Sequence, residues 1–304
     1  MAGFTIGGMP ASRDPDLAFA STRGRWLLAV AVLGSGITFL DSTVVNVALP
    51  DIGRDLGAST SSLQWIVNGY MLTLASLILL GGSLGDRYGR RRVFILGTGL
   101  FTVASGLCAA APNAELLIAA RLLQGVGGAL LTPGSLALIE ASFRPGDRAR
   151  AIGAWSGLGG VATALGPLLG GYLIGAVSWR AIFLINLPLG VFVMAMAARH
   201  APETLDPEAA GGRLDLRGAV LAALGLAGTT YALIEAPERG MTAAILVAAV
   251  GGVLAWFTIS AEVLHTEAEP GGDTPERLAE DFSCGVGAPP LRPGREAECG
   301  FARD

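Results

Sequence analysis

Two ionisable side chains stand inside long apolar runs of the sequence. Asp41 lies in the run 26–48, and Arg121 lies in the run 114–138. A charge at the centre of a bilayer costs at least about 2.5–3.5 kcal/mol, so each side chain needs a partner or a wet cavity. A carboxylate that is buried beside a guanidinium can change its charge when its surroundings change. Asp41 is therefore a candidate proton carrier or substrate contact. The alternative for both residues is a fixed structural pair or a place near the membrane interface.

The composition around these charges is that of a membrane protein. Of the 304 residues, 52% are hydrophobic and 15% are charged, whereas a soluble domain carries roughly 25% charged residues. A bilayer span needs about 20 apolar residues. Apolar runs occur at 26–48, 63–84, 92–111, 114–138, 151–174, 180–198, 217–234 and 241–261. The sequence therefore predicts an all-α polytopic membrane protein with the lipid bilayer as its surroundings.

Two other classes of function are disfavoured by the residue types. The arginines are dispersed among apolar runs instead of gathering on one soluble face, which argues against a nucleic-acid partner. The spans hold no cluster of His, Cys or carboxylate residues with the spacing of a metal site or a nucleophile. We expect a protein that is not an enzyme and has no catalytic residue, metal or cofactor.

The arginines between the apolar runs predict the orientation in the membrane. The linkers of one side hold Arg13, Arg23, Arg25, Arg87, Arg90, Arg91, Arg92, Arg144, Arg148, Arg150, Arg199, Arg213 and Arg217. The linkers of the other side hold Arg54, Arg180 and Arg239. The positive-inside rule places the arginine-rich side in the cytoplasm. With eight spans, both termini of a multi-pass protein of the cell membrane would then be cytoplasmic.

A dense run of charges separates the second and third apolar runs. Residues 82–93 read GSLGDRYGRRRV. A connection this short makes the two flanking helices antiparallel neighbours. Gly85 and Gly89 would allow a tight turn, and Asp86 with the arginines would supply charge contacts that can switch.

The fifth apolar run is rich in small residues. One helical face holds Gly153, Gly157, Gly160, Ala164, Pro167 and Gly171, and the next holds Gly159, Thr163, Gly166 and Gly170. Small faces let helix backbones approach closely, and Pro167 permits a kink. The faces serve tight packing, or a rocking contact between helix bundles that seals the pathway, or both.

Several segments, in order along the chain, match motifs of one family. The charged run carries a signature at Gly82, Leu84, Gly85, Asp86, Arg87, Gly89, Arg90 and Arg91. Leu40–Pro50 and Arg121–Gly125 match motifs of a first and a fourth span, the latter tied to proton coupling. Gly166–Gly171 and Trp179–Gly190 match a fifth-span antiporter motif and the start of a sixth span. Together they resemble the major facilitator superfamily, and within it the drug/proton antiporters with about fourteen spans.

The resemblance covers about residues 25–260 and implies a division of the chain. Residues 1–25 would be a cytoplasmic segment, 26–198 a major-facilitator-type six-helix N-terminal bundle, 199–216 a cytoplasmic linker, and 217–261 two further transmembrane helices. Residues 262–304 form a polar tail, which is either disordered or the product of a shifted reading frame or truncated gene. The family's second six-helix bundle is absent from these residues.

The resemblance also implies roles for individual residues. Asp41, Arg121 and Gln124 would couple proton and substrate movement. The conformational-switch loop would consist of Gly82, Gly85, Asp86, Arg87, Gly89, Arg90 and Arg91. The antiporter motif would include Gly157, Gly166, Pro167, Gly170 and Gly171.

The implied function is proton-coupled efflux of drugs or other small molecules, with amphipathic substrates and the proton gradient as energy source. Such transporters bind substrate between two bundles and rock them to alternate access. One alternative is a non-transporting fragment or gene remnant. The other is a half-transporter subunit whose partner is a separate second-half chain.

Overall fold

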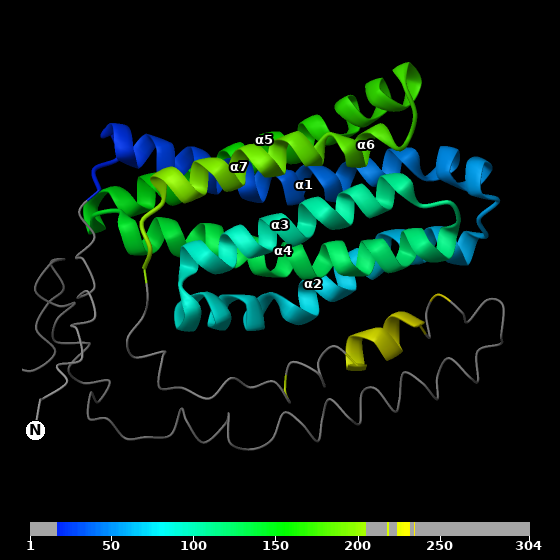
Figure 1. The fold of residues 1–304 in the computed structure, drawn as a ribbon, viewed down its shortest axis with the longest axis horizontal. Helices are drawn as coiled ribbons and strands as arrows, with labels where there is room; N and C mark the ends of the chain where they lie inside the picture. Colours follow the sequence, from blue (N-terminus) through cyan, green and yellow to red (C-terminus); the bar gives the residue numbers. More distant parts are fainter. Residues whose placement is uncertain (1–16, 205–217, 219–223, 232–233, 235–304) are drawn as a thin grey trace, which may run out of the picture. The chain divides into compact units, whose positions relative to one another are not determined.

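The chain is described by a computed structural model, which covers residues 17–204, Gly218, 224–231 and Ile234. The main helices are α1 (Thr22–Leu56), α2 (Thr60–Tyr88), α3 (Arg90–Ala110), α4 (Ala114–Ser142), α5 (Pro145–Ala176), α6 (Ala181–Leu184) and α7 (Asn186–His200). Within the described residues six segments are long and apolar enough to cross a membrane, with α6 and α7 together forming the sixth (Figure 1). The predicted all-α polytopic membrane fold is confirmed.

The two further predicted spans fall mostly outside this description. Residues 224–231 are helical, within the predicted span 217–234. The span 241–261 and the tail 262–304 lie outside the described residues.

Local sequence explains where several helices begin and end. Ser21, Ser59 and Asn113 each accept a hydrogen bond from a backbone N–H three residues further on, which caps the starts of α1, α2 and α4. Pro145 stands at the start of α5, where its missing N–H costs nothing. Gly57 ends α1 in the left-handed conformation at φ 60°.

The sixth span is broken one turn before a proline. Pro188 has no backbone N–H, so the carbonyl of Leu184 loses the helical donor it would find four residues later. Helix α6 ends at Leu184, and α7 begins at Asn186. The break places the Asn186 side chain at a junction inside the bundle, where it is 0% exposed.

The helices alternate in direction and pack around α1, α3 and α4. Helix α4 packs against both α2 and α3, α1 packs against α5, and α1 and α7 also contact one another (Figure 1). Helices α2 and α4 pack closely at Gly81, because a Cβ there would lie 2.0 Å from the carbonyl oxygen of Ala129. Small residues of this kind allow membrane helices to pack backbone to backbone.

We call the two ends of the bundle the Gly89 end and the Trp179 end, after one residue at each. The Gly89 end holds the start of α1, the turns α2–α3 and α4–α5, and the end of α7. The Trp179 end holds the turns α1–α2, α3–α4 and α5–α6.

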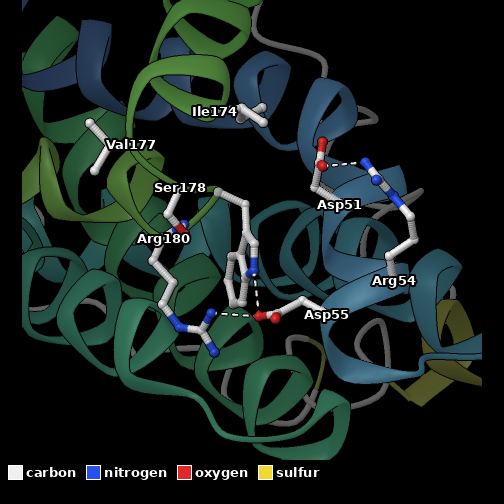
Figure 2. A pocket seen from close by; sticks show the side chains of 8 residues that line it. Asp51, Arg54, Asp55, Ile174, Val177, Ser178 and Arg180 are labelled. Carbon is white, nitrogen blue, oxygen red and sulfur yellow. Dashed lines mark hydrogen bonds and ion pairs between the residues drawn. The ribbon is translucent and has the colours of Figure 1, made fainter.

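A network of charges joins three elements at the Trp179 end. Arg180 lies 2.6 Å from the carboxylate of Asp55, and the indole N–H of Trp179 donates to the same carboxylate at 2.9 Å (Figure 2). Arg180 also donates to the carbonyl of Ala111 at 3.3 Å. The network therefore ties the end of α1 to the α3–α4 turn and the start of α6, beside a shallow pocket that Asp51 and Arg54 also line.

The charged run 82–93 is mostly helical, so the expected loop was wrong in extent. Helix α2 continues to Tyr88 and α3 starts at Arg90, which leaves Gly89 as the junction. Gly89 has φ 107°, a conformation that favours glycine. Gly85 is buried inside α2 and is not part of the turn.

Candidate functional site

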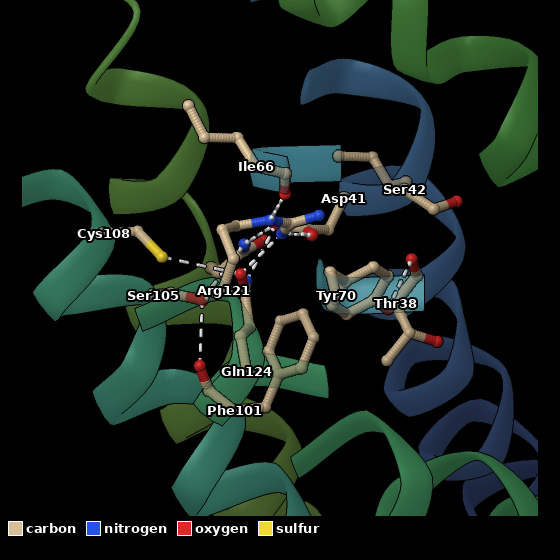
Figure 3. Close-up of polar contacts among 12 residues, drawn as sticks. Thr38, Asp41, Ser42, Ile66, Tyr70, Phe101, Ser105, Cys108, Arg121 and Gln124 are labelled. Carbon is tan, nitrogen blue, oxygen red and sulfur yellow. Dashed lines mark hydrogen bonds and ion pairs between the residues drawn. The ribbon is translucent and has the colours of Figure 1, made fainter. Parts of the chain in front are cut away.

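Asp41 of α1 and Arg121 of α4 form an ion pair in the interior of the bundle. Nη1 of Arg121 lies 2.5 Å from Oδ2 of Asp41, and both side chains are 1% exposed (Figure 3). Arg121 is seven residues into α4, about 10 Å along the helix at 1.5 Å per residue. The pair therefore lies nearer the Trp179 end of the bundle than the Gly89 end.

Gln124 lies one helical turn after Arg121 and contacts both charges. Its Nε2 donates to Oδ1 of Asp41 at 2.9 Å, and its Oε1 accepts from Nη1 of Arg121 at 2.6 Å. Cys108 of α3 lies 3.7 Å from the same Oε1. The structure thus brings together the three residues expected to couple proton and substrate movement.

The guanidinium of Arg121 is also held by α2. Its Nε donates to the carbonyl of Ile66 at 3.1 Å, and its Cζ lies 4.2 Å from the centre of the Tyr70 ring (Figure 3). A cation over an aromatic face is stabilised by about 2 kcal/mol when desolvated. The Tyr70 hydroxyl in turn donates to the carbonyl of Thr38 at 3.4 Å, so α1, α2 and α4 meet at this point.

Asn186 and Ser105 also belong to the site, although the sequence analysis did not predict them as site residues. Nδ2 of Asn186 donates to Oδ1 of Asp41 at 3.1 Å and lies 3.3 Å from the Ser105 hydroxyl. The same hydroxyl accepts from Gln124 at 2.8 Å. Asn186 had a signal, since a primary amide inside an apolar run needs a partner for the reason that Asp41 does. Ser105 had none, because a serine in a helix can bond to its own backbone.

Apolar packing closes the polar site on both sides along the helices. Towards the Gly89 end lies a buried cluster that includes Ile37, Phe94 and Phe101. Towards the Trp179 end lies a second cluster that includes Val44 and Phe183. Water is thereby kept from the ion pair, which strengthens its electrostatic interaction.

The charged residues at the Gly89 end form a second, partly exposed cluster. Arg90 and Asp86 pair at 2.8 Å within one face of the α2–α3 junction. Glu203, which follows α7, lies 3.3 Å from Arg91 and 3.5 Å from Arg92. Arg87 lies over the Tyr88 ring at 5.7 Å. Glu203, which the sequence analysis missed, joins the segment after α7 to the start of α3.

The segment after α7 is also bonded to this junction through the backbone. The N–H of Arg90 donates to the carbonyl of Thr204 at 3.1 Å, and Arg91 donates to the carbonyl of Ala201 at 3.3 Å. A Cβ on Gly89 would lie 2.4 Å from the Glu203 carboxylate. Gly82 lies inside α2, away from these contacts, where a Cβ would meet Pro133 at 3.9 Å.

The residues of the fifth-span motif divide into two groups. Gly166 and Gly170 are buried against α1, where a Cβ on Gly166 would lie 1.9 Å from the Thr43 hydroxyl. Among the described residues, a Cβ added at Gly157 or Gly171 would instead meet no neighbouring atom within 4 Å. Pro167 stands inside α5, which remains a continuous helix. One face of α5 therefore packs on α1, and the other is not covered by any described residue.

The fold resembles that of solved membrane transporters. The human organic anion transporter MFSD10 (TETRAN) matches with a TM-score of 0.55 and 19% identity, over 72% of this chain and 57% of that one. The peptide transporter PepTSo matches with a TM-score of 0.53 and 15% identity, over 77% of this chain and 53% of that one. At these identities the similarity concerns the fold alone. The chain therefore has the helical-bundle fold of membrane transporters.

The chain belongs to the Major Facilitator Superfamily, whose profile matches residues 31–272. The methylenomycin A resistance protein of Bacillus subtilis is 43% identical over 78% of this chain and 50% of its own length. The drug efflux pump JefA of Mycobacterium tuberculosis is 39% identical over 81% of this chain and 49% of its own length. A probable actinorhodin transporter of Streptomyces coelicolor is 41% identical over 81% of this chain and 43% of its own length.

The comparisons agree with the expected family and class. Membership of a transporter family confirms that the chain is not an enzyme, and the relatives at about 40% identity are drug resistance and efflux proteins. The chain spans about half the length of the curated relatives it matches.

Proposed function

We propose that this chain is part of a proton-coupled exporter of small molecules and that Asp41 binds the transported proton. The observation that carries the proposal is a carboxylate 1% exposed, held by Arg121 at 2.5 Å in the interior of the bundle. Uptake of a proton removes the charge that holds Arg121. The contact between α1 and α4 then loses its ion pair, which is a local change that a rocking transporter can use.

The relatives support small molecules as substrates. Two of them are described as a methylenomycin A resistance protein and a drug efflux pump. The substrate of this chain is proposed to be a small amphipathic molecule, because a pathway lined by apolar helices and a few polar side chains suits such compounds.

The arginines support an orientation with the Gly89 end in the cytoplasm. Among the described residues this end carries Arg23, Arg25, Arg87, Arg90, Arg91, Arg92, Arg144, Arg148, Arg150 and Arg199. The Trp179 end carries Arg54 and Arg180. By the positive-inside rule the chain lies in the cell membrane with the start of α1 on the cytoplasmic side.

Inside-out vesicles test the proposed function. An acid interior is imposed, and uptake of ethidium, an amphipathic cation, is followed by fluorescence. We expect uptake that depends on the pH gradient and falls to the level of empty vesicles in Asp41→Asn. The matched control is Asp51→Asn, which removes an exposed pair with Arg54 at the Trp179 end and should keep full uptake. Gradient-driven uptake by Asp41→Asn at the wild-type rate would refute the role of Asp41.

A second candidate is a half-transporter that works only with a separate second-half chain. It is favoured by the face of α5 at Gly157 and Gly171, where no other described residue packs. The vesicle assay is therefore run with this chain alone and with the second half of the Bacillus subtilis relative co-expressed. Uptake only in the second case supports the half-transporter, and equal uptake in both cases contradicts it.

A further inference from the structure

The carboxylate of Asp41 is surrounded by hydrogen-bond donors. Oδ2 accepts from Arg121 at 2.5 Å, and Oδ1 accepts from Gln124 at 2.9 Å and Asn186 at 3.1 Å. Such a set suits an ionised carboxylate, which accepts hydrogen bonds and donates none. A protonated Asp41 would carry an O–H that has to find an acceptor, because a buried polar hydrogen without a partner is costly.

The acceptors within reach of Asp41 differ in what they already bind. Oε1 of Gln124 accepts from Arg121 at 2.6 Å and lies 3.7 Å from the thiol of Cys108. Oδ1 of Asn186, in contrast, is buried and has no hydrogen-bond partner. Asn186 is also 0% exposed, so bulk water does not satisfy this oxygen. Among the described residues of this cluster, Oδ1 of Asn186 is therefore the acceptor available for a new hydrogen bond.

The amide of Asn186 can exchange its donor for its acceptor without moving its backbone. Rotation about the Cβ–Cγ bond by half a turn interchanges Oδ1 and Nδ2, because the two atoms have nearly the same size and position. With Asp41 ionised, the present orientation is enforced, since Oδ1 facing a carboxylate would repel it. With Asp41 protonated, the opposite orientation lets Oδ1 of Asn186 accept a hydrogen bond from the carboxyl O–H.

Ser105 can follow this rotation. Its hydroxyl now donates to the carbonyl of Phe101 at 2.9 Å and accepts from Gln124 and Asn186. When Oδ1 of Asn186 faces it, the hydroxyl hydrogen can turn from Phe101 towards Asn186, because a hydroxyl rotates freely between acceptors. The new orientation therefore leaves the serine satisfied.

We propose that Asn186 is a positioning residue that responds to the charge of Asp41. It donates through Nδ2 to the ionised carboxylate, and it accepts through Oδ1 from the protonated one. The proton itself comes from solution and stays on Asp41, so no bond of Asn186 is made or broken other than hydrogen bonds. This inference rests on the proposed proton exchange at Asp41. Because Asn186 stands at the break between α6 and α7, it reports the charge of Asp41 to the sixth span.

The charged and titratable groups that face Asp41 come from three helices. They are Arg121 of α4, the phenol of Tyr70 of α2 and the thiol of Cys108 of α3. Arg121 stays positive throughout. The phenol and the thiol can donate in their neutral forms, so the charge of Asp41 is read from its own carboxyl carbon.

The test is nuclear magnetic resonance of the purified full chain in lipid nanodiscs. The asparagines of the sequence are Asn46, Asn68, Asn113 and Asn186, so ¹⁵N-asparagine labelling gives few side-chain signals. Asn186→Gln assigns the signal of interest by its loss. Asn68, which is half-buried in α2, is the internal control. The carboxyl carbon of Asp41 is followed in parallel by ¹³C-aspartate labelling.

We expect the Asn186 side-chain signal to shift on acidification with the same midpoint as the Asp41 carboxyl carbon, while Asn68 stays in place. In Asp41→Asn the Asn186 signal should lose its pH dependence. A fixed Asn186 signal beside a titrating Asp41 carbon overturns the role of Asn186 and leaves the proposed function standing. An Asp41 carbon that does not respond to pH overturns both. If Asp41→Asn does not fold, the comparison of the Asn186 and Asp41 signals in the wild-type chain is sufficient.

Discussion

Replacing Arg121 by glutamine should destabilise the bundle strongly. The substitution removes the 2.5 Å ion pair with Asp41, the 3.1 Å hydrogen bond to the Ile66 carbonyl and the 4.2 Å contact with the Tyr70 ring. Breaking one side of a buried ion pair costs about 3–5 kcal/mol, because the other charge stays buried without its partner. We expect a loss of that size in the free energy of unfolding at pH 8.

The double variant Asp41→Asn, Arg121→Gln separates the ion pair from the packing. It buries no charge, and polar contacts between membrane helices are individually worth about 0.6 kcal/mol and at most about 1.7 kcal/mol. The double variant should therefore be more stable than Arg121→Gln by about 1 kcal/mol or more. A matched control is Arg180→Gln, whose pair with Asp55 is 35% and 49% exposed and should matter by about 1 kcal/mol or less.

The assay is reversible unfolding of the purified chain in mixed micelles, followed by fluorescence of its five tryptophans. Additive losses would contradict a stabilising interaction between the two side chains. If the double variant loses the sum of the two single losses, Asp41 and Arg121 do not stabilise each other. A loss in Arg121→Gln no larger than in Arg180→Gln would refute the burial of an ion pair.

Three further predictions follow from the packing and the orientation. Gly125→Ala should cost about 2 kcal/mol or more in the free energy of unfolding, because its Cβ would lie 1.9 Å from the Thr73 hydroxyl. Gly157→Ala meets no described residue within 4 Å and should be neutral or stabilising by up to about 1 kcal/mol. Thermal unfolding compares the two variants, and equal melting temperatures would contradict the α2–α4 contact. Gly89→Ala should cost about 1–3 kcal/mol in the free energy of unfolding, because φ is 107° at Gly89 and Glu203 fills the space beside it. Trypsin should then cleave the α2–α3 junction faster than in the control Gly85→Ala. Unchanged cleavage would contradict the contact of residues 201–204 with this junction. In a background without native cysteines, Val177→Cys should react with an impermeant maleimide in intact cells and Gly146→Cys should not, and the reverse pattern would invert the proposed orientation.

The sequence predicted the helices better than their ends. Hydropathy marked the run 26–48, whereas α1 extends from Thr22 to Leu56. Apolar runs measure the thickness of the bilayer, about 30 Å, and a helix of 35 residues is about 50 Å long. The same limit explains the charged run 82–93, which reads as a loop by polarity but forms helix up to Tyr88 with Asp86 and Arg90 one turn apart.

The site was predicted in part, for a physical reason. The cost of burying a charge singled out Asp41 and Arg121 and required each to have a partner. Gln124 was found through the resemblance. Asn186 and Ser105 are neutral. Asn186 bonds to Asp41 across 145 positions of the chain, and Ser105 joins the cluster through its bonds with Gln124 and Asn186. Pairing at that range depends on how α7 packs on α1 and α3, and how α3 packs on α4, which a single sequence does not reveal.

The direct test of the central claim is to count protons while substrate moves without an imposed pH gradient. Vesicles that contain the chain, with the second half of a relative where needed, are loaded with a pH indicator and given an outward ethidium gradient. We expect ethidium exit to acidify the lumen of wild-type vesicles and Asp41→Asn to carry no proton in exchange. Proton movement of the wild-type size in Asp41→Asn would contradict it.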